Sequence, residues 1–465
     1  MIENDAFKLL LINLFHLNPD DIANILCTTF NKMMVLLVTL TDKHQACPYC
    51  GFTASKIKEY VTKEITHSAL TTQKCIIKYR ARRYKCSCCG KTYYEFNPFV
   101  FKSQKISILT VHNILKDLKD FNETFTSVAR RYHVSPTSVS TIFDNHVDIG
   151  RNPLPEIINF DEVYAFKSEK SKYVCVLLDF KKQIPVDVLP NRKKEYLLNY
   201  FQKIPLEERK KVKYACSDMY EVYRDVVHKV FPEAKHLLDY FHLSQDFHKK
   251  MNQVRIDVMK GYKDNKASDE YYLLKKFNWL LFKNPEDEDK YGRLFDVERE
   301  RKYNSHFKSY MNYYDLRKKL LEINNDLTIC YSLKLELVDF YSKSTVDNAK
   351  ENLENLIRSC IDTNIDEMIA FSNNLINWKQ EIINSFTIVG TEYKVEADKG
   401  QVVVCNKKVN NAIIENRNKI IKCIKNNANG YTNWSRFRNR VMYVLDPNAT
   451  FSLEPREKQS WMHKT

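Results

Sequence analysis

The chain has 465 residues, of which 44% are hydrophobic and 28% are charged, and its formal net charge is +15. This composition excludes a disordered chain, the length predicts several domains, and only 8 glycines effectively exclude Gly-rich phosphate loops. The positive charge suits nucleic acid, an acidic membrane face or an acidic protein as partner, although a general bias toward lysine and asparagine explains it equally well.

We expect a cytoplasmic protein without a membrane partner. The apolar stretch 9–15 follows Glu3 and Asp5 and lacks a small-residue cleavage site, which is not typical of a signal peptide. The apolar stretch 33–40 is far shorter than the roughly 18–20 residues that span a bilayer. The 13 cysteines are an odd number in a long chain, which favours reduced thiols and metal binding over disulfides.

The first half of the chain predicts three kinds of structure in order. A short helix and a strand over 34–41 precede a cysteine-rich region with β-rich runs, such as 74–84, and residues 105–147 are helical in pattern. Apolar runs of strand length then follow at 157–166, 173–180, 184–189 and 212–217. Such runs favour a mixed α/β domain.

The second half is mainly helical in pattern. A helix is predicted over 220–230, a further short apolar run lies at 235–240, and long helical patterns fill 245–385. Residues 410–445 predict two helices separated at Gly430.

Two Cys-x-x-Cys turns, each followed by glycine, predict a structural zinc site. They are Cys47-Pro-Tyr-Cys50-Gly and Cys86-Ser-Cys-Cys89-Gly. Zn²⁺ takes four thiolates at tetrahedral corners, and two tight turns each supply two of them. The intervening stretch 51–85 is long enough for an additional β-hairpin, and Cys88, Cys75 and His67 are alternative ligands. The alternative interpretation is a set of buried or redox-active cysteines, and the basic flanks suit either nucleic acid or solvent.

Residues 125–143 predict a helix-turn-helix. One helix begins at Val128 and Ala129 and ends near Tyr132. Ser135 caps the next with Pro136 at its first position, and its inner face is formed by Val139, Ile142 and Phe143. Short polar side chains would face a major groove, and two arginines would meet phosphates: Thr137, Ser138, Ser140, Thr141, Arg130 and Arg131. Any small helical hairpin would give a similar pattern.

Three acids in distant parts of the chain predict a divalent-cation site. Asp161 lies in the apolar run Ile157–Phe166, Asp218 ends a second run, and Glu415 lies in a helical pattern. A charged carboxylate in an apolar strand is costly unless a partner such as a metal ion offsets it. Two strand aspartates and a helix glutamate are the arrangement of an RNase H-like nuclease site with two magnesium or manganese ions. Glu162, the next residue, should point to the other strand face and pair with a lysine or with solvent.

The sequence around these residues resembles that of the bacterial insertion-sequence transposases of the ISL-three family. The resemblance rests on CPYCG, RRYKCSCCGKTYYE, NFDEVYAFK, YACSDMYEVYRDVV, FPEAKHLLDYFHL and IIENRNKIIKCIKNNANGYTNWSRFRNRVMYVL, in that order over nearly the whole chain. It implies a multidomain α/β protein. Its parts would be a zinc-ribbon-like region (1–100), a helix-turn-helix DNA-binding domain (101–150) and an RNase H-like catalytic domain (151–248 and 396–465) interrupted by an all-helical insertion (249–395).

The resemblance also implies roles for individual residues. Asp161, Asp218 and Glu415 match the catalytic acids, although Asn416 stands where the family's Glu-Gly-x-Asn motif has glycine. Asp239 and His242 belong to the LLDYFHL motif and are expected beside the metals, the alternatives being a helix N-cap and a packed histidine. A final arginine group is expected to contact the DNA backbone, the alternative being a solvated helix face: Arg436, Arg438 and Arg440.

These features predict a DDE transposase. It would bind the terminal inverted repeats of its insertion sequence, cleave a phosphodiester at each end with divalent metal, and transfer the freed 3′-hydroxyl to target DNA. Pairing two ends predicts a homodimer on double-stranded DNA, in the cytoplasm at the nucleoid. The rival from another class is a non-catalytic DNA-binding repressor derived from a transposase, and a simple nuclease would not need two DNA-reading modules.

Overall fold

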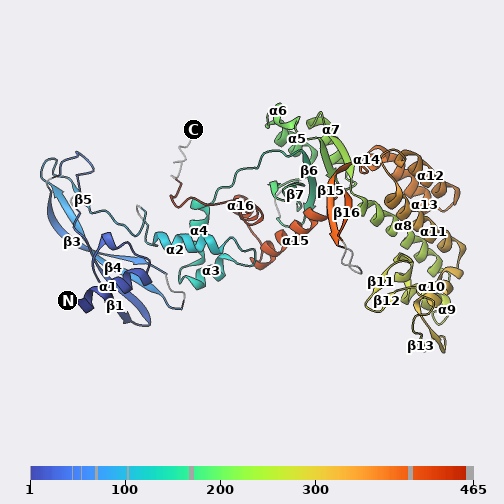
Figure 1. The fold of residues 1–465 in the computed structure, drawn as a ribbon, viewed down its shortest axis with the longest axis horizontal. Coiled ribbons are helices and arrows are strands. Elements are labelled where there is room, and N and C mark those ends of the chain that lie inside the picture. Colours follow the sequence, from blue (N-terminus) through green and yellow to red (C-terminus); the bar gives the residue numbers. More distant parts are fainter. Residues whose placement is uncertain are drawn as a thin grey trace.

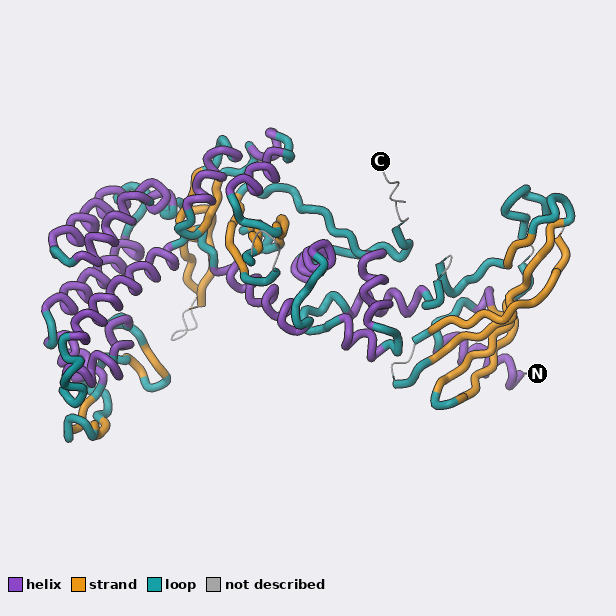
Figure 2. The backbone as a smooth tube through the Cα atoms, turned by 180° about the vertical axis from the view of Figure 1, so that it is seen from behind, coloured by secondary structure: helices purple, strands orange, loops and turns teal. Residues whose placement is uncertain are grey.

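Four parts follow one another along the longest axis of the molecule (Figure 1). The computed structural model describes residues 2–43, 45–53, 55–68, 72–101, 104–166, 172–395 and 402–456. A β-sheet region lies at one end and a bundle of helices at the other, with three short helices and a central sheet between them (Figures 1 and 2). The chain is therefore a multidomain protein of mixed α/β structure, as predicted. Among the described helices, none combines the length and the apolar character needed to cross a membrane.

The N-terminal part is a five-stranded sheet with one helix packed on it. The elements are α1 (Ile2–Leu14), β1 (Ile22–Phe30), β2 (Met33–Leu40), β3 (Ser55–Thr66), β4 (Cys75–Cys86) and β5 (Thr92–Tyr94). The strand order is β1-β2-β4-β3, with β5 paired to β4. The predicted strand over 34–41 is β2, whereas β1 was not predicted. Only Ile22 and Ile25 of its nine residues are buried, so it lacks the alternation that marks a strand.

Three short helices form the next part. They are α2 (Ile108–Asp117), α3 (Phe125–Arg131) and α4 (Pro136–His146). The side chain of Ser135 accepts a hydrogen bond from the Ser138 amide, and Pro136 occupies the first turn of α4, as the sequence predicted. Val139 and Phe143 are fully buried between the helices. The first of the two predicted helices begins earlier than expected, at Phe125, after a capping box at Thr124.

The central part is a mixed five-stranded sheet covered on both faces. The strands are β6 (Ile157–Val163), β7 (Val174–Asp179), β8 (Pro185–Leu189), β9 (Tyr214–Ser217) and β10 (Lys235–Leu238), in the order β10-β9-β6-β7-β8. The strands β7 and β8 continue antiparallel from β6, while β9 and β10 run parallel to it. One face packs on α5 (Lys194–Gln202) and α7 (Glu221–Val230), and the other on α15 (Ala412–Asn427) and α16 (Trp434–Leu445). Burial on both faces explains why these strands appear as continuous apolar runs.

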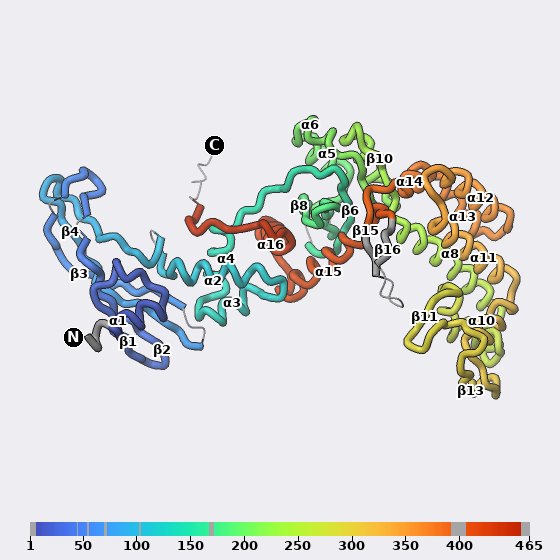
Figure 3. The backbone as a smooth tube through the Cα atoms, viewed as in Figure 1, coloured from blue at the N-terminus to red at the C-terminus, as the bar shows by residue number. Residues whose placement is uncertain are grey.

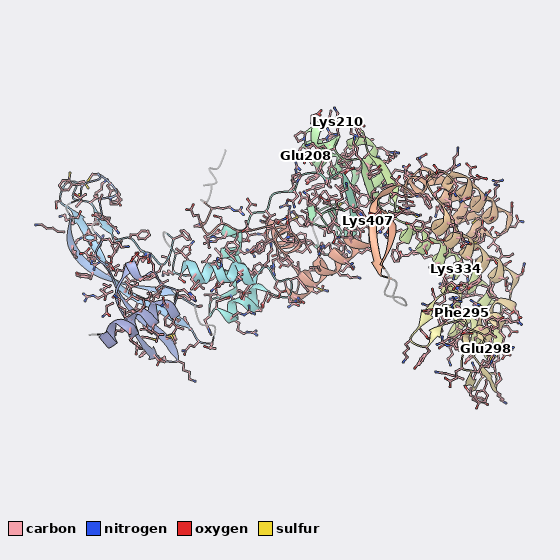
Figure 4. All side chains as sticks on the ribbon, in the orientation of Figure 1. Glu208, Lys210, Phe295, Glu298, Lys334 and Lys407 are labelled. Atoms are coloured by element: carbon pink, nitrogen blue, oxygen red, sulfur yellow. The ribbon has the colours of Figure 1, made fainter. Side chains whose placement is uncertain are left out.

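Short segments connect this sheet to its neighbours. The helix α6 (Leu206–Arg209) lies at the outer end of the central part, where Glu208 forms an ion pair with Arg151 of the segment that enters the sheet (Figure 4). The hairpin of β15 (Ile388–Val395) and β16 (Val402–Lys408), which carries Lys407, leads back from the helical part to α15 (Figure 4). The last helices thus return to the middle of the molecule, beside α4 (Figure 3).

The helical part is not all-helical, which corrects the prediction. Its helices are α8 (Tyr240–Lys260), α9 (Asp269–Lys276), α10 (Tyr313–Glu322), α11 (Asn325–Lys343), α12 (Ala349–Asp362), α13 (Asp366–Asn377) and α14 (Lys379–Asn384). Two small hairpins interrupt them, formed by β11 (Glu288–Asp289), β12 (Gly292–Arg293), β13 (Lys302–Asn304) and β14 (Ser309–Met311). These strands have two or three residues each, which is too short to show a strand period in the sequence. Inside the bundle, the buried Lys334 ammonium donates to the carbonyl oxygens of Leu281 and Lys283 (Figure 4).

Candidate active site and zinc centre

Two aspartates lie side by side where parallel strands of the central sheet end. Asp161 is near the end of β6, and Asp218 follows the last residue of β9. The strands are in register with Asn159 opposite Cys216, so two further residues along each strand bring Asp161 opposite Asp218. Strand pairing alone therefore places the two carboxyl groups at one edge of the sheet.

A third strand adds another acid to the same edge. Leu238 of β10 pairs with Ser217 of β9, and the Asp239 amide donates to the Ser217 carbonyl oxygen at 3.1 Å. Asp239 occupies the N-cap position of α8 without a side-chain capping hydrogen bond. Its carboxylate instead lies 3.9 Å from His242 Nε2, one turn into the helix. Asp239 and His242, which were expected beside the metals, therefore lie at the same edge of the sheet as Asp161 and Asp218. We call this edge the acidic edge.

The C-terminal helix α15 brings the remaining acid across from the far end of the chain. Asn159 Nδ2 donates to Asn411 Oδ1 at 2.7 Å, which ties the start of α15 to β6. One turn later, Glu415 lies with Asp239 and His242, and ligand atoms of these three residues are all within 4.8 Å of one another. The helix dipole also points its positive end toward these carboxylates.

Asn418 is a site residue that was not predicted from the sequence. Its Nδ2 donates to Asp161 Oδ2 at 2.8 Å, from one turn beyond Glu415 on α15. The residue was visible in the Glu415-Asn416-Arg417-Asn418 motif. Asn418 follows Glu415 by three positions in a helical pattern, and this spacing places both side chains on one face of the helix.

Buried polar atoms without partners converge at this edge. They come from four different elements and are Asp218 Oδ1, Asp239 Oδ2, His242 Nε2 and Asn418 Oδ1. A buried polar atom left without a hydrogen bond costs about 1–3 kcal/mol, so four together need a ligand. Three of the four atoms are carboxylate or amide oxygens, which suit Mg²⁺ or Mn²⁺ rather than a soft metal. The residues therefore fit a divalent cation.

Burial and the charges of neighbouring acids raise the pKa values of Asp161 and Asp218. Burial raises the pKa of Asp161 to about 7, and the neighbouring charges of Asp218 and Glu415 act in the same direction. Burial and the charge of Glu162 raise the pKa of Asp218 to about 6. A cation at this edge would favour the ionised forms, so metal binding must release protons near neutral pH.

We expect Asp161→Asn to stabilise the metal-free protein at pH 8. The carboxyl of Asp161 ionises near 3.8 when unfolded and near 7 when folded, so the folded state holds the extra proton between these values. Stability therefore falls as pH rises through this window and stays low above it. A neutral side chain avoids this loss, which is on the order of 2–4 kcal/mol. Asn418 can turn its amide to present its unpartnered Oδ1 to the new side chain.

Chemical denaturation at pH 5 and pH 8 without added Mg²⁺ measures this effect. The free energy of unfolding of the unsubstituted chain should fall between the two pH values more steeply than that of Asp161→Asn. Parallel pH profiles for the two proteins would contradict the buried, protonated state of Asp161.

Glu162 lies on the opposite strand face and is paired, but not with a lysine. Its carboxylate forms an ion pair with Arg192 and accepts a hydrogen bond from the Tyr223 hydroxyl at 3.3 Å. The Arg192 guanidinium in turn lies 4.7 Å from the centre of the Tyr220 ring. The side chain is thus held away from the acidic edge, although its charge is still felt by Asp218.

The four cysteines form one cluster at the tip of the N-terminal sheet. The Sγ atoms of Cys47 and Cys89 are 3.7 Å apart, those of Cys50 and Cys86 are 3.6 Å apart, and all four lie within 4.8 Å. The antiparallel strands β3 and β4 bring the two turns together, because Ser55 pairs with Cys86. The long spacing between the cysteine pairs is therefore taken up mainly by the two antiparallel strands β3 and β4.

The two turns share the same backbone geometry. The Cys47 amide donates to the Phe52 carbonyl and the Gly51 amide to the Cys47 carbonyl, both at 2.9 Å. Gly51 has φ +74°, a conformation that an L side chain rarely adopts. The second turn repeats this around Cys86 and Gly90, whose φ is +69°. Hydrogen bonds from the amides of residues 89 and 88 lower the pKa of the Cys86 thiol to about 6, as suits a metal thiolate.

The alternative ligands lie elsewhere. His67 is buried and hydrogen-bonded to Ser107 and to the Phe15 carbonyl oxygen. Cys75 is buried in the core under α1. Cys88 is exposed and stands outside the cluster of four.

The predicted DNA-reading residues of the helix-turn-helix divide into two groups. Thr137 and Thr141 are exposed on α4, and Arg130 is exposed on α3. Ser138 is half-buried and its hydroxyl lies 2.8 Å from that of Ser135. Arg131 is already occupied by ion pairs with two acids of the same domain, Asp117 and Glu123, which corrects the expectation that it is available for phosphate.

The arginines of α16 are structural clamps, which corrects a second expectation. Arg436 forms a bidentate pair with Asp144 of α4, at 2.9 Å and 2.6 Å, and Arg438 pairs with Asp187 of β8 at 2.6 Å. Arg440 is 1% exposed and donates to backbone carbonyl oxygens of residues 120 and 123. The helix therefore fastens the helix-turn-helix to the central sheet instead of presenting free cations. Their partners lie more than 200 residues away in the sequence, so the pattern of α16 alone could not show them.

Known protein families match two stretches of the chain. A family model described as "Transposase" matches residues 158–397, and one described as "zinc-finger of transposase IS204/IS1001/IS1096/IS1165" matches residues 43–89. The chain is 19% identical over 412 residues to the transposase for insertion sequence element IS1001 of Bordetella parapertussis, covering 88% of this chain and 91% of that protein. The second match coincides with the cysteine cluster.

Proposed function

The chain belongs to the ISL-three family of DDE transposases, whose model covers more than half of its residues, and from this premise we propose that it cleaves and joins DNA at the ends of its own element. The observation that carries the proposal is the convergence of Asp161, Asp218, Asp239 and Glu415 at one sheet edge, with buried oxygen atoms left unpartnered. Two strand aspartates and a helix glutamate are the arrangement of an RNase H-like nuclease. We therefore propose that fold for the central part.

The acidic edge supports a metal-dependent phosphoryl transfer. When bound there, two Mg²⁺ or Mn²⁺ ions would lower the pKa of the attacking water or 3′-hydroxyl and stabilise the leaving oxygen. Asp161 and Asp218 would ligate from the strand ends after losing their protons, and Glu415 from α15. Asn418 holds Asp161 in one rotamer through its 2.8 Å hydrogen bond. His242, whose Nε2 is buried and unpartnered, would donate to a phosphate oxygen or pair with Asp239.

The N-terminal parts would read the DNA. A structural Zn²⁺ on Cys47, Cys50, Cys86 and Cys89 would hold the tip of the sheet, and α4 would enter a major groove with Thr137, Ser138 and Thr141. The ion pairs that Arg436 and Arg438 of α16 form with Asp144 and Asp187 would keep the helix-turn-helix at a fixed position relative to the acidic edge. Because two element ends are joined, we propose a homodimer on double-stranded DNA, acting in the cytoplasm at the nucleoid.

The direct test is cleavage of DNA that carries the ends of the element. The purified chain should produce 3′-hydroxyl ends at the element boundary with Mg²⁺, and no cutting without a divalent cation. Specific binding of the ends without cleavage under any metal condition would instead support the repressor. Cleavage of any DNA without end preference would support a simple nuclease.

Substitution of the two neighbouring arginines of α3 should separate DNA contact from folding. We expect Arg130→Ala to weaken end binding by about tenfold and to reduce the salt dependence by roughly one phosphate contact, at unchanged stability. Arg131→Ala breaks ion pairs to Asp117 and Glu123, and should destabilise the domain by about 1 kcal/mol. Salt titrations of binding and thermal denaturation of both variants measure the difference. If binding of end DNA depends on salt concentration equally in Arg130→Ala and in the unsubstituted chain, Arg130 does not contact a DNA phosphate.

A further inference from the structure

Two histidines and a glutamate form a second cluster outside the acidic edge. His228 lies in the last turn of α7, His236 on β10 and Glu381 on α14. His228 Nε2 is 3.9 Å and His236 Nδ1 is 4.0 Å from the same oxygen, Glu381 Oε1. Ligand atoms of the three residues all lie within 4.8 Å of one another. Both rings therefore face one carboxylate oxygen.

A chain of hydrogen bonds determines which nitrogen of His236 carries the proton. The Ser217 hydroxyl donates to the backbone carbonyl oxygen of Asp218 at 2.9 Å, and the same hydroxyl oxygen lies 2.9 Å from His236 Nε2. With the hydroxyl proton directed to that carbonyl oxygen, Nε2 is assigned as the donor in this contact. The other nitrogen, Nδ1, then carries a lone pair.

This lone pair is buried and has no hydrogen-bond partner. His236 is 1% exposed, Glu381 is 5% exposed, and Nδ1 makes no hydrogen bond. Burial lowers the pKa of His236 to about 3, so the ring stays neutral at physiological pH. A nitrogen lone pair and a carboxylate oxygen thus face each other across 4.0 Å, an arrangement that a cation between them would satisfy.

Two basic side chains of the neighbouring groove are engaged elsewhere. Arg224 lies 4.3 Å from the Trp378 ring centre and donates to the Asn377 carbonyl oxygen at 2.9 Å. Lys379 forms an ion pair with Glu354 at 2.7 Å. Neither therefore compensates the Glu381 carboxylate in the way that an ion held between the two rings would.

We propose that His228, His236 and Glu381 bind a divalent transition-metal ion, with Zn²⁺ as the first candidate. Two imidazoles and a carboxylate are a ligand set that Zn²⁺ takes in proteins, with a fourth position left to water. That position would open toward the groove lined by His228, Lys379 and Gln380. Tetrahedral ligands at ~2.0–2.1 Å from zinc lie roughly 3.4 Å apart, so each nitrogen needs to approach Glu381 Oε1 by roughly 0.5 Å from its distance of 3.9 Å or 4.0 Å.

The ion would fasten the helical part to the central sheet. The Asn384 side chain of α14 already donates to the His236 carbonyl oxygen at 2.9 Å, so the two elements meet at this point. From His236 the Ser217 hydroxyl leads directly to the backbone of Asp218. The site is thus separate from the acidic edge but supports the strand end from which Asp218 projects.

Zinc content of the full-length protein tests this assignment. After dialysis against zinc-free buffer, the unsubstituted chain should retain two equivalents of Zn²⁺, one on the cysteine cluster and one on His228, His236 and Glu381. His228→Ala, at an exposed helix position, should retain one equivalent and stay folded. Glu381→Gln should give the same loss without a change of shape. His112→Ala, at an exposed position on α2, is the matched control and should retain two.

Co²⁺ substitution identifies which site is lost. Both His228→Ala and Glu381→Gln should lose absorption from nitrogen and oxygen ligands, while the thiolate charge-transfer bands of the cysteine cluster remain. Equal metal content in the unsubstituted chain and His228→Ala, with only thiolate-ligated cobalt in both, would overturn the proposal and leave a water between the rings and Glu381.

Discussion

Asp218→Asn should reduce metal-dependent cleavage of element-end DNA by about 10³-fold or more. The substitution keeps the shape of the side chain but removes a negative charge at the centre of the acidic edge, where Oδ1 is buried and unpartnered. A 10³-fold loss corresponds to about 4 kcal/mol of transition-state stabilisation, which is the scale expected for a metal ligand. Single-turnover cleavage with Mg²⁺ on end DNA measures the rate.

Binding of the ends should remain unchanged in Asp218→Asn, because the cysteine cluster and α4 lie in other parts of the molecule. Asp225→Asn is the matched control. It removes an aspartate from the exposed side of α7, where the carboxylate pairs with Lys194, and should cleave at the normal rate. Equal cutting by Asp218→Asn and the unsubstituted chain would show that the acidic edge is not the reaction centre.

Cys89→Ser should release the structural zinc and unfold the tip of the N-terminal sheet. Among the described residues, the buried side chains at the tip are Cys47, Cys86 and Tyr93, and the first two belong to the cysteine cluster itself. Structural Zn²⁺ sites contribute on the order of 10 kcal/mol of apparent binding free energy, far more than such a group can replace. Zinc affinity of the cluster should therefore fall well beyond the roughly 10–100-fold typical of losses outside the ligand shell.

Cys88→Ser is an adjacent control, since Cys88 is exposed and outside the cluster of four. It should keep its zinc, its resistance to proteolysis at the two turns and its affinity for end DNA. Cys89→Ser should lose all three, while the main thermal transition stays in place because the core under α1 is separate. Retention of zinc by Cys89→Ser and its loss from Cys88→Ser would reverse the assignment of the fourth ligand.

Local chemistry explains which parts of the candidate site were predictable. The cysteine turns need nothing beyond their own residues and the glycines that follow, and α4 begins where Ser135 and Pro136 require it. Continuous apolar runs likewise predicted four strands of the central sheet, and a further short apolar run marked the fifth, because both faces are covered. Asp161 could be identified as a candidate site residue for the same reason, because it is an acid within such an apolar run.

Long-range contacts explain the predictions that failed. The arginines of α16 have the spacing of a DNA-binding face, yet Asp144 and Asp187 take two of them into internal ion pairs. Arg131 likewise forms internal ion pairs, with Asp117 and Glu123. A guanidinium binds whichever carboxylate the fold brings to it, so its role cannot be assigned from the pattern of its own helix.

The sequence by itself determined the two cysteine turns, the start of α4 and the apolar strands of the central sheet, because each depends on residues within a few positions. Only the tertiary structure decided how distant residues meet. It brought Asn418 onto Asp161 across 257 positions, and it placed His228, His236 and Glu381 around one point. The physical reason is that a side chain's partners are set by the packing of helices and strands, while the local pattern specifies only which helix or strand forms.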